Sequence, residues 1–110
     1  MKKIFVSQPL RGLNAEDSKI VREAACKMAI KKIADKYGEK IEDLEIIDSF
    51  FKDYNPDKGC IPLKYLSKSI ELLADADYAY FGKGWEDARG CKIEHDAAVA
   101  YGLDIIYEEG

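Results

Sequence analysis

Apolar residues are distributed along the chain in two ways, as short continuous runs and as longer segments with helical spacing. The short runs are rich in β-branched and aromatic residues, and glycine, proline or charged residues bound them. Such runs are typical of buried strands. We therefore expect strands at residues 2–7, 44–47, 78–81 and 104–107.

The segments between these runs carry apolar residues three and four positions apart, which predicts amphipathic helices. The first extends from an N-cap at Asn14 to about Tyr37, the second from Pro62 to about Asp75, and the third over about 90–101. The apolar face of the first helix includes Val21, Ala25, Ala29 and Ile33, and one face of the second holds Leu63, Leu66, Ile70 and Leu73. In the third helix Ile93, Ala97 and Ala100 should pack on the sheet.

The alternation of strands and helices predicts an α/β fold for residues 1–110 as a single domain. With right-handed crossovers it gives a small, doubly wound, four-stranded parallel sheet of order 2-1-3-4, flavodoxin- or Rossmann-like, with helices on both faces. The direction of winding reverses between the first and third strands. A ligand crevice is expected there, at the carboxyl ends of these strands.

Composition narrows the classes of partner. The chain has 110 residues, a net charge of −4 and no basic stripe, so we expect neither a nucleic-acid polymer nor a membrane as partner. A small anion such as a nucleotide needs only one or two cations and stays open. Cys26, Cys60 and Cys91 form neither a zinc pattern nor a disulfide framework, which indicates free thiols in the cytoplasm and no metal or organic cofactor.

The loops at 7–12 and 82–90 follow the first and third strands, so both should border the crevice. The third helix should point its N-terminus into it, which favours anions. Glu94 lies about one turn into that helix, beside the expected sheet-facing residues, whereas His95 and Asp96 are expected further outward. Glu94 is either a crevice residue or a helix-start acid that interacts favourably with the helix dipole, worth about 0.3–1 kcal/mol.

Other polar and aromatic residues near these loops could serve either a ligand-binding or a structural role. Arg11 and Arg89 could hold a phosphate or carboxylate, or could form surface salt bridges. Trp85 could stack on a base or cover the end of the sheet. His95 has no second ligand nearby and is read as a surface residue rather than a metal ligand, and no histidine is spaced to activate Cys91 as a nucleophile.

Two stretches together carry a family resemblance, "KIFVSQPLRG" at the start and "ADYAYFGKGWEDARGCKIEHDAAVAYGLDIIY" near the end. With the strand order between them, the chain resembles the nucleoside 2-deoxyribosyltransferase-like superfamily over nearly its whole length. It is most similar to a short, often phage- or prophage-type branch, related to deoxynucleoside 5′-monophosphate N-hydrolases.

The resemblance implies a glutamate nucleophile, and Glu94 matches its position four residues after Gly90. It implies that a nucleoside or nucleotide contacts residues of both loops and of the second helix. These candidate substrate-binding residues are Ser7, Gln8, Arg11, Gly12, Ser69, Gly84, Trp85, Asp87, Arg89 and Gly90. Two positions depart from the pattern: Ser69 stands where the hydrolases have a base-assisting aspartate, and Phe5 stands where they have a tyrosine.

Two functions follow from these observations. The first is an enzyme that cleaves or transfers the N-glycosidic bond of a deoxynucleoside or its 5′-monophosphate, with Glu94 as nucleophile. The second is a protein that binds such a nucleotide in the same crevice without catalysis. Relatives build sites at subunit contacts, so a homo-oligomer is expected. The aromatic residues that could form a contact patch, or pack beneath the central loop, are Phe50, Phe51, Tyr54 and Tyr65.

Overall fold

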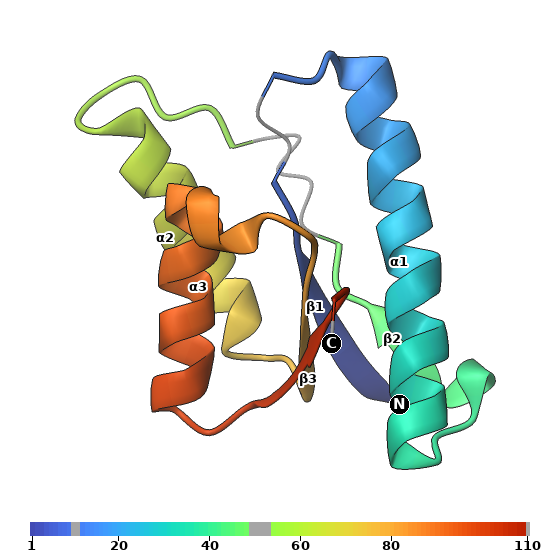
Figure 1. Ribbon diagram of the computed structural model, residues 1–110. Coiled ribbons are helices and arrows are strands. Elements are labelled where there is room, and N and C mark those ends of the chain that lie inside the picture. Colours follow the sequence, from blue (N-terminus) through green and yellow to red (C-terminus); the bar gives the residue numbers. More distant parts are fainter. Residues whose placement is uncertain (10–11, 49–53, 110) are drawn as a thin grey trace.

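A computed structural model describes residues 1–9, 12–48 and 54–109 (Figure 1). The strands are β1 (Lys2–Ser7), β2 (Leu44–Ile46), β3 (Tyr78–Phe81) and β4 (Asp104–Tyr107). The helices are α1 (Ala15–Tyr37), α2 (Ile61–Leu73) and α3 (Arg89–Ala100), with short 3₁₀ turns η1 (Ile41–Asp43) and η2 (Trp85–Asp87). The predicted order of elements is confirmed.

The strands form one parallel sheet in the predicted order β2-β1-β3-β4. Ser7 is in register with Phe81, and Phe81 with Tyr107. The last residues of β1, β3 and β4 therefore lie side by side along the carboxyl edge of the sheet. β1 and β3 are neighbours although they are not consecutive in sequence, so the predicted reversal of winding lies between them.

Helices cover both faces of the sheet and complete a three-layer arrangement. Figure 1 shows α1 on one face, and α2 and α3 together on the other. A core cluster on the α1 face includes Ile4, Val6 and Ile33, and a second cluster on the opposite face includes Phe5 and Phe81. Ile4 and Val6 alternate with Phe5 because successive side chains of a strand point to opposite faces.

The ends of α1 follow from local chemistry. The side chain of Asn14 accepts a hydrogen bond from the backbone N–H of Asp17 at 2.7 Å, as an N-cap does. Gly38 ends the helix in the left-handed conformation, at φ +69°, which a residue without Cβ adopts at little cost. Two other boundaries were predicted slightly too late, since β2 ends at Ile46 and α2 at Leu73.

The face of α3 that contacts the sheet differs from the predicted one. Its buried residues are Cys91, Glu94 and Ala98, whereas Ile93 and Ala100 are exposed and Ala97 is half-buried. The small side chains of Cys91 and Ala98 let the helix backbone lie close to the sheet, and α3 also packs against α2, near which Ile93 lies. Glu94 is therefore on the sheet-facing side rather than beside it.

In α1 the prediction was wrong at one position. Ala25, Ala29 and Ile33 are buried as expected, but Val21 is exposed. Arg22, one residue later, is half-buried and lies at the end of the buried row. Within the described residues no helix is long and apolar enough to span a bilayer.

Candidate functional site

Glu94 is the central polar residue at the carboxyl edge of the sheet. It lies in the second turn of α3, and only 8% of its surface is exposed. Ser7, the last residue of β1, is equally buried, and its Oγ donates a hydrogen bond to Glu94 Oε1 at 2.6 Å. This bond joins the end of the central strand to the first turns of α3, at the predicted switch point.

Burial raises the pKa of Glu94 above its ordinary value, because the carboxylate loses contact with water. Three groups act in the opposite direction by stabilising the carboxylate: the hydrogen bond from Ser7, the positive charge of Arg22 and a hydrogen bond from Ser69. Burial has the larger effect. The carboxyl group therefore ionises at higher pH than a surface glutamate, while its surroundings are arranged to bind the ionised form.

Arg22 is the cation whose positive charge lowers the pKa of Glu94, and the sequence analysis did not identify it. It extends from α1 to the end of β1, where its Nη1 donates a hydrogen bond to the Val6 carbonyl at 2.7 Å. Its position in the helical spacing of α1 could have identified it. Arg22 lies three residues before Ala25 and so continues the buried row toward the carboxyl edge, where a charged side chain in an apolar row points to a polar site.

Ser69 and Phe5, the two departures from the family pattern, both bear on this site. Ser69 lies on α2 near Glu94, and its hydroxyl lowers the pKa of the Glu94 carboxyl by favouring the ionised form. Phe5 is buried on the same face of β1 as Ser7, two residues earlier, and packs in the core. It has no hydroxyl to offer. Ser7 supplies the hydrogen bond to Glu94 instead.

Cys91, one turn before Glu94 on the buried face of α3, adjoins the same groups. Its pKa is raised, chiefly by burial and also by the negative charge of Glu94, whereas a hydrogen bond with Ser7 lowers it. A thiol with a raised pKa is a weak nucleophile at neutral pH. The structure thus gives no support to a cysteine nucleophile at this position.

The loop after β3 passes close to the loop after β1. A Cβ on Gly82 would lie 3.0 Å from the Cβ of Gln8, and Gly84, at φ +85°, faces Pro9. A side chain at position 82 would require Gln8 to shift, whereas at position 84 there is room for a Cβ and the positive φ is what favours glycine. Gln8 Oε1 is buried, and no donor among the described residues reaches it. An acceptor in that state is available to a ligand N–H or O–H.

Trp85 belongs to a cluster of rings that also holds His95. The two rings stack with centroids 3.8 Å apart, and Tyr107 lies next to them, with its hydroxyl 2.7 Å from His95 Nε2. The prediction that His95 points outward was wrong, since only 13% of its side chain is exposed, whereas Asp96 is exposed as expected. The ring of Trp85 attracts the imidazole because stacking removes apolar surface of both from water.

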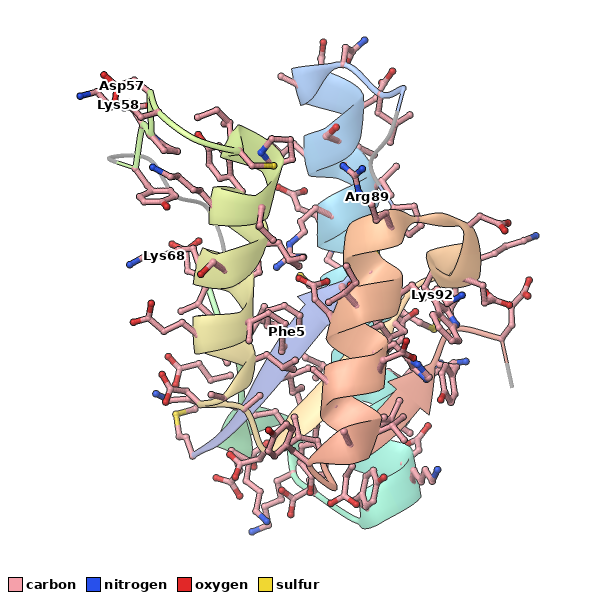
Figure 2. The ribbon with its side chains drawn as sticks, turned by 90° about the vertical axis from the view of Figure 1, so that its left-hand side faces the viewer. Phe5, Asp57, Lys58, Lys68, Arg89 and Lys92 are labelled. Carbon is pink, nitrogen blue, oxygen red and sulfur yellow. The ribbon has the colours of Figure 1, made fainter. Side chains whose placement is uncertain are left out.

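The remaining candidates lie around the site rather than in contact with Glu94. Arg89 and Asp87 are exposed, and Figure 2 shows the Arg89 side chain projecting from the first turn of α3 beyond the helix end. Gly90 borders a groove between α3 and α2, and Gly12 is exposed, with no neighbour within 4 Å of a built Cβ. Arg11 lies outside the described residues.

Across residues 1–9, 12–48 and 54–109, no group of three or more His, Cys, Asp or Glu side chains could hold a metal ion. The polar groups that converge at the carboxyl edge are one carboxylate, two hydroxyls and one guanidinium, from Glu94, Ser7, Ser69 and Arg22. Such a set can bind the hydroxyl groups of a sugar and can present a carboxylate to an electrophilic carbon.

A family model matches nearly the whole chain. The family model described as "Domain of unknown function (DUF4406)" matches residues 2–107, which includes every element of the fold. None of the curated proteins matches the chain.

Proposed function

The chain belongs to the DUF4406 family, and we propose that it cleaves or transfers the N-glycosidic bond of a deoxynucleoside or its 5′-monophosphate. One observation carries the proposal: a buried carboxylate, that of Glu94, is held by the Ser7 hydroxyl at 2.6 Å at the switch point of the sheet. Ligands of doubly wound sheets bind at this place. The sequence resemblance to the nucleoside 2-deoxyribosyltransferase-like superfamily supplies the class of substrate.

In the proposed reaction the free carboxylate oxygen of Glu94 attacks the anomeric carbon of the sugar. The bond from this carbon to the base nitrogen breaks, and its electron pair leaves with the base, which takes a proton from a donor or from water. A glycosyl ester of Glu94 results. Water, or the nitrogen of a second base, then attacks the anomeric carbon from the opposite side and releases the carboxylate.

The electrostatics of the site favour this step. The transition state carries positive charge on the sugar ring, next to the Glu94 carboxylate. Burial makes the ionised carboxylate unfavourable when no positive charge is nearby to offset the loss of water. Attraction between the two charges is stronger in the transition state than in the ground state, which is the condition for catalysis. Ser7 holds one carboxylate oxygen, Oε1, by its hydrogen bond, and Ser7, Arg22 and Ser69 each favour the ionised form that attacks.

A non-catalytic nucleotide-binding protein is the second candidate, and the residues at the two positions that depart from the family pattern favour it. Ser69, in place of an aspartate, has no carboxyl group to assist the leaving base, and Phe5, in place of a tyrosine, has no hydroxyl to position the nucleophile. In this reading Glu94 and the unpaired oxygen of Gln8 recognise the ligand and no bond is broken.

The test is incubation of the purified protein with each deoxynucleoside and each 5′-monophosphate, with released base measured by chromatography. Glu94→Gln keeps the size and hydrogen bonding of the side chain but removes the nucleophile. Glu86→Gln, an exposed glutamate of η2, is the matched control. Base release that is lost only in Glu94→Gln supports the enzyme. Thermal stabilisation by a nucleotide without base release would leave the binding protein.

We also propose that the protein self-associates in the cytoplasm. Leu63 and Ile93 are exposed by 58% and 44% beside the groove between α2 and α3, and a second copy could cover them. Tyr54 and Tyr65 instead pack edge-to-face on each other, while Phe50 and Phe51 lie outside the described residues. All three cysteines are free, as suits a reducing compartment. Light scattering after gel filtration, with Ile93→Gln as the variant, tests the association.

A further inference from the structure

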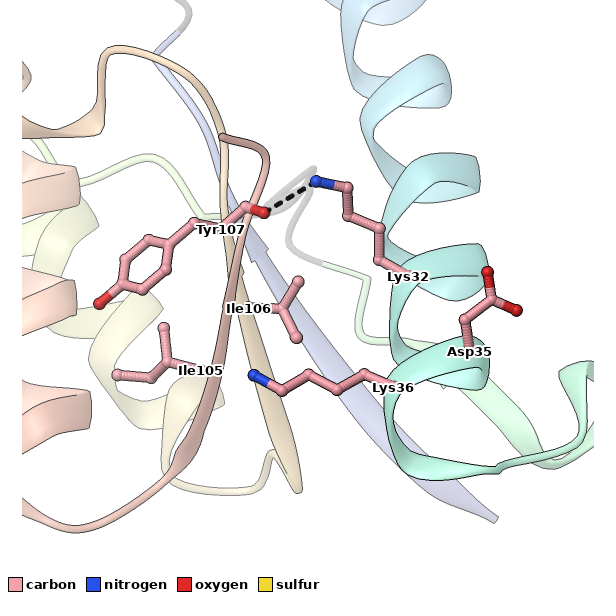
Figure 3. Close-up of a pocket in the computed structure, with 6 residues that line it drawn as sticks. All are labelled: Lys32, Asp35, Lys36, Ile105, Ile106 and Tyr107. Atoms are coloured by element: carbon pink, nitrogen blue, oxygen red, sulfur yellow. Dashed lines mark hydrogen bonds between the residues drawn. The ribbon is translucent and has the colours of Figure 1, made fainter. Parts of the chain in front are cut away.

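We propose that the outer edge of β4, with the groove between β4 and α1, binds an extended acidic peptide as a fifth strand of the sheet. The groove is a cavity of about 420 Å³, lined by Lys32, Asp35 and Lys36 of α1 and by Ile105, Ile106 and Tyr107 of β4 (Figure 3). It lies on the opposite face of the sheet from Glu94 and is independent of the proposed reaction.

β4 is an edge strand, paired on one side only. In a parallel ladder, alternate residues direct both backbone groups to the same neighbour. The N–H of Glu108 donates to the Phe81 carbonyl of β3 at 2.9 Å, so the even-numbered residues of this strand point inward. Ile105 and Tyr107 point outward, as the hydrogen bond from Lys32 Nζ to the Tyr107 carbonyl at 3.1 Å bears out.

The outward edge is only partly occupied. Lys32 donates hydrogen bonds to the carbonyls of Tyr107 and Glu108. A lysine on an edge strand disfavours unspecific pairing with other strands. The N–H and carbonyl of Ile105 and the N–H of Tyr107 form no hydrogen bond with another described residue outside the ladder. A strand laid beside Ile105 could exchange two backbone hydrogen bonds with that residue.

Charge selects the occupant. Lys32 and Lys36 extend from α1 toward β4 (Figure 3), and with Asp35 as the third charged lining residue the groove carries a net positive charge. Neither lysine forms an ion pair with another described residue. The acids that follow β4 are engaged elsewhere, since Glu109 pairs with Lys83 at 3.4 Å and Glu108 accepts a hydrogen bond from the Tyr80 hydroxyl at 3.5 Å.

Geometry specifies the spacing of the acids in the peptide. Lys32 and Lys36 are one helical turn apart, about 6 Å along the axis at 1.5 Å per residue. Two residues of a strand span about 6.6 Å, and such residues share one face. The groove therefore fits a peptide with carboxylates at alternate positions facing α1, and with apolar side chains between them.

A second copy of this chain fits the edge less well. If two copies of β4 paired in antiparallel orientation through their outward residues, Ile105 of one copy would lie opposite Tyr107 of the other. The two-fold axis would then pass through Ile106. Asp104 would then lie opposite Glu108 of the other copy. Like charges directly across a strand pair are destabilising. The proposed partner is thus a different, acidic segment.

The test is titration of the full chain with a short blocked peptide that alternates Glu and Val, followed by amide hydrogen exchange. We expect slower exchange of the Ile105 and Tyr107 amides. We expect binding to weaken roughly tenfold in Lys36→Glu, where an attraction becomes a repulsion, and to be unchanged in Lys31→Glu, an exposed lysine of the same helix.

A form of the peptide with N-methyl groups on the edge that faces β4 keeps its charges, but the methyl groups prevent the close approach of the two backbones, so it should not protect Ile105. Equal protection by the two peptides would overturn the added strand. Absence of protection at Ile105 with the unmodified peptide would overturn the site. Protection that grows with protein concentration and needs no peptide would assign the edge to a second copy and would also overturn the proposal.

Discussion

Replacement of Glu94 by Gln should make the protein more stable at neutral pH. Burial raises the pKa of Glu94 in the folded state above the ordinary value of 4.5 that applies in the unfolded chain. Between these two pKa values the folded state binds one more proton than the unfolded state, so stability falls as pH rises. Gln keeps an oxygen to accept the Ser7 hydroxyl but cannot ionise, so the variant does not undergo this loss.

The magnitude follows from linkage. In the window from the unfolded to the folded pKa, the wild type should lose about 1.4 kcal/mol of unfolding free energy per pH unit relative to the variant. In a domain of this size, 1 kcal/mol shifts the melting temperature by about 4 °C. Thermal unfolding of both proteins at pH values from 4 to 8 should show curves that coincide at the acidic end and then separate. The pH at which the separation levels off gives the folded pKa.

Glu86→Gln is the control, because an exposed glutamate should give a difference that does not change with pH over this range. A constant difference between wild type and Glu94→Gln would refute the reasoning. So would a wild type that gains stability relative to the variant as pH rises, because it would mean that Ser7, Arg22 and Ser69 stabilise the carboxylate by more than burial destabilises it.

Three further predictions concern single residues around the site and the frame that holds it. Ser7→Ala should reduce stability at neutral pH by about 1.5–3 kcal/mol, as expected for a lost hydrogen bond to a buried charged group, and chemical unfolding with Ser67→Ala as the exposed control measures this. Arg22→Met should raise the pKa of Glu94 further and shift the fall of kcat/KM for base release at acidic pH to higher pH. Arg22→Lys keeps the positive charge, so it should shift this acidic fall less. An unshifted pH profile in Arg22→Met would contradict the role assigned to Arg22. Asn14→Ala should lower the unfolding free energy by about 1 kcal/mol, measured by thermal unfolding, because α1 loses its N-cap. At a temperature where the variant is folded, base release should be unchanged. An unchanged melting temperature would show that the cap contributes nothing to stability.

Much of the fold could be predicted because each local signal agreed with the others. The strands β3 and β4 begin and end where the apolar runs do, and Asn14 and Gly38 mark both ends of α1. The order of the sheet follows from the alternation of elements and from the handedness of crossovers. The boundaries that were displaced, at Ile46 and Leu73, lie where flanking apolar residues extend the pattern beyond the hydrogen-bonded element.

The rotation of α3 could not be predicted from periodicity. Ile93, Ala97 and Ala100 form a more apolar row than Cys91, Glu94 and Ala98, yet the second row faces the sheet. A carboxylate can replace an apolar residue there because Ser7, on another element, supplies a hydrogen bond. Such a partner is more than 80 residues away in sequence, as the separation of 87 for this pair shows, so a helical pattern alone contains no trace of it.

Arg22 and His95 illustrate the same limit in opposite directions. Arg22 was overlooked because a charged residue on a helix is ordinarily solvated, although its position at the end of a buried row contained the information. His95 was placed outside because it lies off the row of Ile93, Ala97 and Ala100 that was expected to pack on the sheet. Its partners are the Trp85 ring and the Tyr107 hydroxyl, which only the folded chain brings to it.

The most direct test of the central claim is the mass of the intact protein, quenched in acid during reaction with a deoxynucleoside or its 5′-monophosphate. A glutamate nucleophile predicts a species heavier by one deoxyribosyl or phosphodeoxyribosyl group, which peptide mapping assigns to Glu94 and which Glu94→Gln does not form. Base release that continues unchanged in Glu94→Gln, or an adduct mapped to another residue, would contradict the account.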